Sequence, residues 1–84
     1  MTAEVYTKPN CPFCVRAKAL LEKRGIEYTE VSAVDHREAL IERVTADTGA
    51  APRTVPQIYL DGQHVGGHDE LVKHFAALDA ASAE

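Results

Sequence analysis

Two cysteines separated by two residues, Cys11 and Cys14, are the only thiols among the 84 residues of the chain. They follow a short apolar run, residues 3–7, whose composition predicts a β-strand that ends at Pro9-Asn10. After Cys11 the apolar residues recur at steps of three and four, the spacing of one face of a helix. Pro12 suits a first helical turn because its missing N–H would have no partner there. We therefore expect Cys11 at or just before a helix N-terminus.

This position favours the thiolate form of Cys11. Free N–H groups and the positive end of the helix dipole stabilise negative charge, and the basic residues Lys8, Arg16 and Lys18 lie close in sequence. Such surroundings lower the pKa of a cysteine from about 8.5 to roughly 3.5–7.5, and the thiolate is the species that attacks a disulfide. We expect Cys14, one helical turn further on, to be more buried and to keep its proton longer. The pair therefore predicts thiol–disulfide exchange, in which Cys11 attacks and Cys14 resolves the mixed disulfide.

Two other interpretations of the cysteine pair are weaker. A C-x-x-C sequence can be half of a zinc site, but zinc needs four ligands and the chain has no second C-x-x-C. Only the spacing of His64, His68 and His74 would suit the other half. A purely structural disulfide across two residues would close so short a loop that it would stabilise the fold little. Because a predicted strand, a C-x-x-C pair and a predicted helix follow one another in the sequence, redox chemistry is the favoured interpretation.

Composition limits the remaining possibilities. The length predicts one domain, residues 1–84, with a small core. A net charge of −4 and the lack of a basic block argue against nucleic acid as a partner, and no apolar run approaches the roughly 18 residues of a membrane helix. The first residues carry no basic segment followed by a long apolar one, as a signal peptide would. A lone C-x-x-C without an export signal fits a reducing compartment, so we expect a cytoplasmic protein.

The first half of the chain predicts two strands and two helices. Strand 3–7 leads into a helix over residues 12–24, which Gly25 ends. A second strand over residues 26–31 should pair in parallel with the first through a right-handed crossover. A second helix should follow with Asp35 as its N-cap and carry four inward residues: Ala39, Leu40, Val44 and Ala46.

The second half predicts a hairpin and a last helix. Two short apolar runs, residues 54–60 and 63–65, flank Asp61-Gly62, the strongest hairpin signal in the chain. Pro56 forfeits a ladder hydrogen bond there, and the residues alone leave open whether its peptide bond is cis or trans. The last helix should precede a frayed tail over residues 79–84 and carry four apolar residues: Leu71, Val72, Phe75 and Leu78. The order β-α-β-α-β-β-α predicts an α/β, thioredoxin-like fold, a four-stranded mixed sheet flanked by three helices that cover both faces.

The chain resembles the glutaredoxins of the dithiol class over nearly its whole length. Several separate motifs carry this resemblance, in the order that the family has them: Tyr6-Thr7-Lys8, Cys11-Pro12-Phe13-Cys14, and residues 16–21, 54–58 and 64–69. The resemblance implies a glutathione-dependent thiol–disulfide oxidoreductase that reduces protein disulfides and glutathione mixed disulfides. Cys11 would be the nucleophile that takes up glutathione, and Cys14 would be the resolving thiol.

The same resemblance implies a glutathione groove made of eight further residues: Lys8, Phe13, Thr54, Val55, Pro56, Gly67, His68 and Asp69. Lys8 would meet the glycine carboxylate of glutathione, with Arg43 or Arg53 as weaker candidates. The backbone of Val55 would pair with the glutathione peptide beside a cis Pro56.

The γ-glutamyl end of glutathione would lie at Gly67-His68-Asp69, where helix N–H groups suit its carboxylate and Asp69 can pair with its ammonium. Phe13 would form one wall of the groove, although many dithiol relatives have tyrosine there and so offer a hydroxyl that this chain lacks. Two other departures from the family are the alanine-rich segment 46–52 and Glu70, which replaces a second aspartate common after the Gly-Gly bend. The change at Glu70 is mild, whereas Phe13 and segment 46–52 leave the affinity for glutathione open.

Glutathione would serve as the reductant, with no permanently bound cofactor. The implied partners are glutathionylated or disulfide-containing proteins and, indirectly, glutathione reductase, and the chain should act as a monomer. Two alternatives are a glutaredoxin-like protein reduced by thioredoxin reductase, and a dimer that holds a [2Fe–2S] cluster through Cys11 of each chain and two glutathiones. Lys8 and the pocket at residues 67–69 argue against the first alternative, and Pro12, which stiffens the loop, argues against the second.

Overall fold

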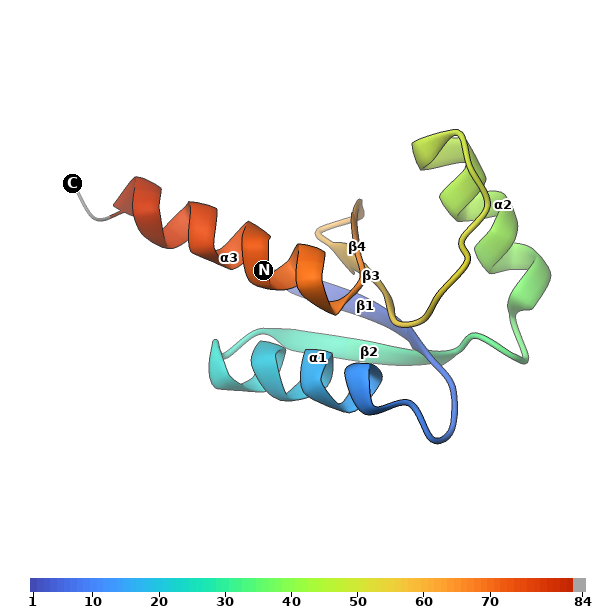
Figure 1. The fold of residues 1–84 in the computed structure, drawn as a ribbon, viewed down its shortest axis with the longest axis horizontal. Coiled ribbons are helices and arrows are strands. Elements are labelled where there is room, and N and C mark those ends of the chain that lie inside the picture. Colours follow the sequence, from blue (N-terminus) through green and yellow to red (C-terminus); the bar gives the residue numbers. More distant parts are fainter. Residues whose placement is uncertain (83–84) are drawn as a thin grey trace.

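The computed structural model describes residues 1–82, and Figure 1 shows its elements in the predicted order. They are β1 (Thr2–Thr7), α1 (Pro12–Lys23), β2 (Glu27–Ser32), α2 (Arg37–Thr48), β3 (Gln57–Leu60), β4 (Gln63–Gly66) and α3 (His68–Ser82). The strands form one mixed sheet in the order β2-β1-β3-β4, in which β1 pairs in parallel with β2 and antiparallel with β3. The predicted topology is therefore confirmed. None of the helices in residues 1–82 has the length and apolarity that a membrane span needs.

Two hydrophobic clusters lie on opposite faces of the sheet, because neighbouring side chains of a strand point in opposite directions. Val5 points to the face covered by α1 and α3, and Tyr6 points to the face covered by α2, which Figure 1 shows apart from the other two helices. The first cluster contains Ala3, Val5, Ala17, Leu21, Ile58, Leu60, Leu71 and Phe75. The second contains Tyr6, Ala33, Leu40, Val44 and Tyr59. The two faces are separate packing units that share β1 and β3, and the C-x-x-C helix belongs to the first.

The hairpin between β3 and β4 has the turn that Asp61-Gly62 predicts. Both residues have positive φ angles, 48° and 81°, as a type I′ turn requires. β3 begins only at Gln57, later than predicted, since Pro56 has no N–H to donate to a sheet ladder. The Val55–Pro56 peptide bond is cis, which confirms the expectation drawn from the family resemblance.

Helix α2 begins later than predicted. His36, and not Asp35, occupies the N-cap position and makes no side-chain capping bond. The Asp35 N–H instead donates to the Ser32 hydroxyl at 3.1 Å, so the serine closes the turn before the helix. The prediction of Asp35 as N-cap is wrong because a short polar side chain three residues earlier competes for the same backbone.

The buried stripes of α2 and α3 are narrower than predicted. Leu40 and Val44 are buried in α2, and Leu71 and Phe75 in α3, each pair four residues apart on one side of its helix. The other residues that were expected to face inward are exposed: Ala39, Ala46, Val72 and Leu78. A short helix on the surface of one small sheet buries a single line of side chains, so helical spacing alone overstates the core.

Helix α3 continues through Ser82, although the sequence predicts a frayed tail from residue 79. Asp79 accepts two hydrogen bonds from the Arg24 guanidinium, at 2.6 and 3.2 Å, and the guanidinium carbon lies 4.3 Å from the centre of the Phe75 ring. This contact ties the end of α1 to α3 beyond the point where fraying was expected. Residues 83 and 84, the rest of the predicted tail, lie outside the described part of the chain.

Candidate functional site

The side chain of Cys11 caps the first turn of α1. Cys11 occupies the N-cap position, with Pro12 directly after it, and its Sγ accepts a hydrogen bond from the Cys14 N–H at 3.2 Å. The two cysteines are joined by a disulfide across a Cα–Cα distance of 5.2 Å. In the reduced protein, the same N–H and the helix dipole would stabilise a Cys11 thiolate. Cys11 is 8% exposed and Cys14 is 2% exposed, so Cys14 is the more buried of the two residues, as the sequence predicts.

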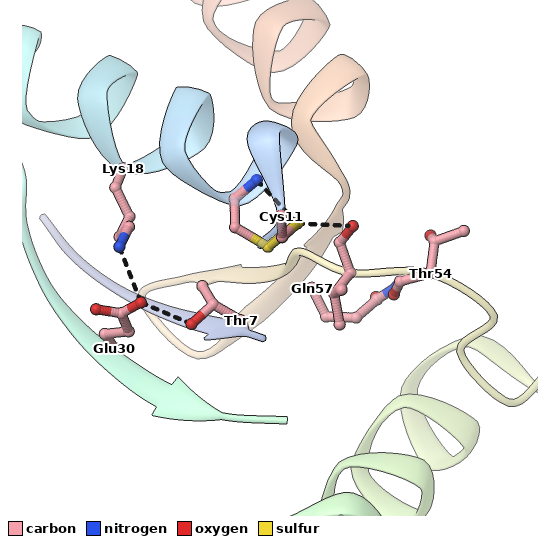
Figure 2. The surroundings of a disulfide bond; sticks show 8 residues. Thr7, Cys11, Lys18, Glu30, Thr54 and Gln57 are labelled. Carbon is pink, nitrogen blue, oxygen red and sulfur yellow. Dashed lines mark hydrogen bonds and ion pairs between the residues drawn. A yellow bond between two sulfur atoms is a disulfide. The ribbon is translucent and has the colours of Figure 1, made fainter. Parts of the chain in front are cut away.

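The Cys11 sulfur faces the loop that precedes β3. Its Sγ lies 3.8 Å from the Val55 carbonyl oxygen, and Figure 2 shows this contact beside the disulfide. Gln57 braces the loop, because its Nε2 donates to the Thr54 carbonyl at 2.8 Å and its Oε1 lies 2.8 Å from His64 Nε2. This role of Gln57 was not predicted from the sequence. A polar residue inside an apolar run was the available signal, but its two partners become neighbours only in the folded hairpin.

An open groove runs from this loop to the start of α3. Seven of the eight predicted groove residues line it: Phe13, Thr54, Val55, Pro56, Gly67, His68 and Asp69. Glu70, which was not predicted, lines it as well. The Phe13 ring packs on the His68 ring, with 5.8 Å between their centres, and the Arg16 guanidinium carbon lies 5.2 Å from the Phe13 ring centre. Phe13 is 49% exposed, so about half of this residue is accessible from solvent.

Glu70 occupies part of the helix start that borders this groove. Its Oε1 accepts the Gly67 N–H at 3.1 Å, the contact by which a glutamate in the first turn caps a helix. The side chain of Asp69 is exposed, and its Oδ1 lies 3.3 Å from His68 Nδ1. The spacing of Glu70, three residues after Gly67, was a usable signal for this capping contact.

Lys8, the eighth predicted groove residue, lines a second hollow, which shares Thr54 and Val55 with the groove. Two arginines join Lys8 there, Arg37 from the first turn of α2 and Arg53 from the loop before the cis proline, and we call this the cationic hollow. Its remaining lining is apolar: Ala33, Val34, Leu40, Ile41 and Pro52. The sequence pointed to Lys8 and Arg53 but not to Arg37, which reaches this place only through the packing of α2.

Arg43, the other weaker candidate for the glycine carboxylate, is engaged elsewhere. Its guanidinium donates to both Glu4 carboxylate oxygens, at 2.7 and 2.9 Å, and to the Tyr6 hydroxyl at 3.1 Å. It also lies 3.7 Å from the centre of the Tyr59 ring, whose hydroxyl donates to Asp47 at 2.8 Å. The hydrogen bond from Arg43 lowers the pKa of Glu4, and burial together with the bond to Asp47 raises the pKa of Tyr59. Arg43 therefore belongs to the α2 face of the sheet and not to the cationic hollow.

A third hollow, the thiol hollow, opens beside the disulfide. Both cysteines line it, with the charged residues Lys8, Lys18 and Glu30 and with four others: Pro9, Asn10, Pro12 and Val15. Lys18 Nζ donates to Glu30 Oε2 at 2.9 Å, and the Thr7 hydroxyl donates to the same oxygen at 2.6 Å (Figure 2). These two bonds, the one from Thr7 first, hold the pKa of Glu30 below its ordinary value. Lys18 is thus part of an ion pair, whereas the sequence suggested a simple added positive charge.

The histidines do not complete a metal site with the cysteines. Within residues 1–82, no three histidine, cysteine or acidic side chains are grouped so that they could hold a metal ion. The zinc interpretation of the C-x-x-C pair therefore finds no second half at His64, His68 or His74.

The fold and the paired cysteines define a class, the thiol–disulfide oxidoreductases of thioredoxin-like fold. A family model described as Glutaredoxin matches residues 3–65, and the chain belongs to the glutaredoxin family. Glutaredoxin 3 of Escherichia coli (strain K12) is 46% identical over 77 residues, which are 92% of this chain and 84% of that protein. As a family member that retains both cysteines, the chain is a thiol–disulfide oxidoreductase.

Two further relatives bear on the fold and on the length of the chain. A crystal structure of a buckwheat glutaredoxin–glutathione complex has a TM-score of 0.73 at 27% identity, over 89% of this chain and 68% of that chain, and it confirms the thioredoxin-like fold. The hybrid peroxiredoxin hyPrx5 of Haemophilus influenzae is 43% identical over 72 residues. That match covers 86% of this chain but only 28% of the hybrid peroxiredoxin.

Proposed function

We propose that this protein is a glutathione-dependent oxidoreductase that reduces glutathione mixed disulfides and protein disulfides. One observation carries the proposal: the Cys11 sulfur lies 3.8 Å from the Val55 carbonyl oxygen, on the loop that the groove and the cationic hollow share. A short peptide extended along this loop would pair with the Val55 backbone and bring its own sulfur to Cys11. Glutathione, a tripeptide with a central cysteine, suits that arrangement.

The charges at the two ends of this loop support glutathione over a simple thiol. At the cationic hollow, Lys8, Arg37 and Arg53 suit the glycine carboxylate. In the groove, the N-terminus of α3 suits the γ-glutamyl carboxylate, and Asp69 suits the neighbouring ammonium. The buckwheat glutaredoxin, which was solved as a glutathione complex, adds support from a relative.

The proposed reaction with a glutathione mixed disulfide needs Cys11 alone. The Cys11 thiolate attacks the glutathione sulfur, a Cys11–glutathione disulfide forms, and the substrate sulfur leaves as a thiolate that takes up a proton. A second glutathione thiolate then attacks the bound glutathione sulfur. Cys11 leaves as a thiolate, and the product is glutathione disulfide.

The proposed reaction with a protein disulfide needs both cysteines. Cys11 attacks one substrate sulfur and forms a mixed disulfide, and the other substrate sulfur leaves as a thiolate. The Cys14 sulfur then attacks Cys11, the Cys11–Cys14 disulfide forms, and the second substrate sulfur is released. Two glutathione molecules return the pair to the dithiol and leave as glutathione disulfide.

The proposal includes the setting of the reaction. A lone C-x-x-C stays reduced in a compartment such as the cytoplasm, where glutathione reductase would regenerate glutathione. We expect a single domain that works as a monomer and holds no permanent cofactor. In the cluster-binding alternative, Cys11 would have to ligate iron from a loop that Pro12 stiffens.

The test is the reduction of a small glutathione mixed disulfide, with NADPH consumption coupled through glutathione and glutathione reductase. A parallel arm replaces those two components with thioredoxin reductase, and Cys11→Ser protein is the control. We expect turnover only in the glutathione arm. Turnover only with thioredoxin reductase would overturn the glutathione dependence, and silence in both arms with visible absorbance after anaerobic reconstitution would favour the cluster-binding dimer.

A further inference from the structure

An ion pair stands beside the resolving cysteine. Cys14 and Lys18 are four residues apart in α1, so their side chains lie on one side of the helix, with about 6 Å between the Cβ atoms. Both residues line the thiol hollow, and Glu30 reaches the same hollow from β2. Figure 2 shows the Lys18 ammonium pointing at the Glu30 carboxylate, which it meets at 2.9 Å.

The central strand holds this ion pair in place. The hydroxyl of Thr7, a residue that is 5% exposed, donates to the same Glu30 oxygen that accepts from Lys18. The side chains of Lys18 and Glu30 are 25% and 45% exposed. An ion pair this open to water contributes little to stability, so its place next to the thiols, rather than its strength, is the feature to explain.

The two charges of the pair act on Cys14 in opposite directions. A lysine favours a nearby thiolate, and a glutamate favours the protonated thiol. Because the two charges are in contact, their effects on Cys14 nearly cancel, and burial then keeps the thiol protonated. Lys8 is the third charged residue among the described residues that line the hollow, and the α1 dipole acts most strongly at its N-cap, Cys11.

We propose that Lys18 and Glu30 form a matched ion pair in which each charge balances the effect of the other on Cys14, and that this balance sets how much turnover follows the two-thiol route. The two are positioning residues, since they act through Cys14 and not on the substrate. The inference rests on the proposed roles of Cys11 and Cys14, but not on the choice of glutathione as reductant.

The step on which the pair acts is the closure of the internal disulfide. Cys14 loses its proton to water, and its sulfur bonds to Cys11 while the bond between Cys11 and the substrate sulfur breaks. The electron pair of that bond leaves with the substrate sulfur, which takes up a proton, so no outside oxidant or reductant takes part. If Cys14 ionises readily, the internal disulfide closes early. If Cys14 stays protonated, a second glutathione has time to attack the mixed disulfide by the one-thiol route.

The test titrates Cys14 directly through the ultraviolet absorbance of its thiolate, in protein that carries Cys11→Ser. Protein with both cysteines replaced by serine supplies the tyrosine background. Glu30→Gln should lower the pKa of Cys14 by roughly one unit, because it leaves Lys18 unmatched, and Lys18→Met should raise it by roughly as much. The variant with both changes should return the pKa to within about 0.3 of the starting value.

The matched control is Asp79→Asn, which breaks another ion pair of α1, the one with Arg24 at the far end of the helix. It should leave the pKa of Cys14 unchanged. If the pKa of Cys14 shifts in the same direction in Glu30→Gln and in Lys18→Met, the proposal is overturned, because lost packing and not charge would explain both shifts. The proposal is also overturned if the pKa shifts in neither variant. If one variant fails to fold, the direction of the Cys14 pKa shift in the other variant still supports or contradicts the proposal.

The titration uses no glutathione, so its failure and the failure of the proposed function are distinguishable. In protein with both cysteines, the amount of Cys11–glutathione disulfide trapped by acid during turnover gives a second measurement. It should fall in Glu30→Gln and rise in Lys18→Met. Equal amounts in the two variants would contradict the proposed control of the two-thiol route.

Discussion

Each face of the sheet carries an ion pair between a helix cation and a strand glutamate, and the two pairs differ in what surrounds them. On the α2 face, Arg43 binds Glu4 through two hydrogen bonds and lies over the ring of Tyr59. On the α1 face, Lys18 binds Glu30 through one hydrogen bond, at the edge of a hollow that the cysteines line. A planar guanidinium suits a bidentate and stacked contact, whereas an ammonium acts as a point charge.

The role of an ion pair therefore follows from its neighbours. The Arg43 pair touches tyrosines and no thiol, so we assign it to the scaffold. The Lys18 pair adds little to packing and stands beside a group whose reactivity depends on charge. We therefore call the surroundings of the Arg43 pair the scaffold side, and the surroundings of the Lys18 pair together with the cysteines, the groove and the cationic hollow the redox side. The following experiments test that division.

The largest expected effect lies on the redox side. Cys11→Ser should lower turnover of every disulfide substrate by roughly a thousandfold or more, because a serine hydroxyl without an activating base is a poor nucleophile. Cys14→Ser should keep the reduction of glutathione mixed disulfides and lose the reduction of protein disulfides that need the second thiol. The coupled NADPH assay with one substrate of each kind measures both. Equal losses in the two variants would contradict the separate roles.

The second effect is on stability and separates the two ion pairs. Arg43→Met should lower the free energy of unfolding by about 1–2 kcal/mol, since it removes charged hydrogen bonds and a stacked contact, whereas Lys18→Met should lower it by no more than about 0.5 kcal/mol. Urea titrations of the oxidised proteins measure this difference. Turnover by Arg43→Met should match that of the parent at a temperature where both are folded. Similar losses of stability in the two variants would remove the distinction between the faces.

The third effect tests the groove on the redox side. Asp69→Asn should raise the KM for a glutathione mixed disulfide by about fivefold to tenfold, with little change in kcat, because the partner proposed for the γ-glutamyl ammonium is lost. Glu27→Gln, a change of the same type at an exposed acid on β2, is the matched control and should leave KM unchanged. Unchanged KM in both variants would place the γ-glutamyl end elsewhere.

The smallest effect is a pH dependence on the scaffold side. The hydrogen bonds from Arg43 lower the pKa of Glu4 below 4.5. A carboxyl group whose pKa is lower in the folded state stabilises the fold above its unfolded pKa, and this contribution is lost as the pH falls through the folded pKa. Between about pH 5 and pH 3, the parent should therefore lose a few tenths of a kcal/mol more than Arg43→Met. Parallel pH profiles of the urea midpoints would contradict this assignment.

Local sequence was enough for the elements and for the cysteine site. The C-x-x-C pair with Pro12 predicted a helix N-terminus at Cys11, and Asp61-Gly62 predicted the turn of the hairpin, since both depend on a few consecutive residues. The family resemblance added the cis bond at Pro56 and seven of the residues that line the groove. The errors concern where a helix begins and which side chains are buried: Asp35 is not an N-cap, and Val72 is exposed.

The amino-acid sequence is enough to indicate which residues could do redox chemistry and in what order the strands and helices occur, because backbone preferences and apolar periodicity act over short distances. Which charges meet depends on the tertiary structure. Arg43 and Lys18 are alike in sequence as helix cations, yet Arg43 lies over the Tyr59 ring and Lys18 lines the same hollow as Cys14. Their glutamate partners are 39 and 12 residues away along the chain, so the packing of each helix on its own face of the sheet determines the pairing.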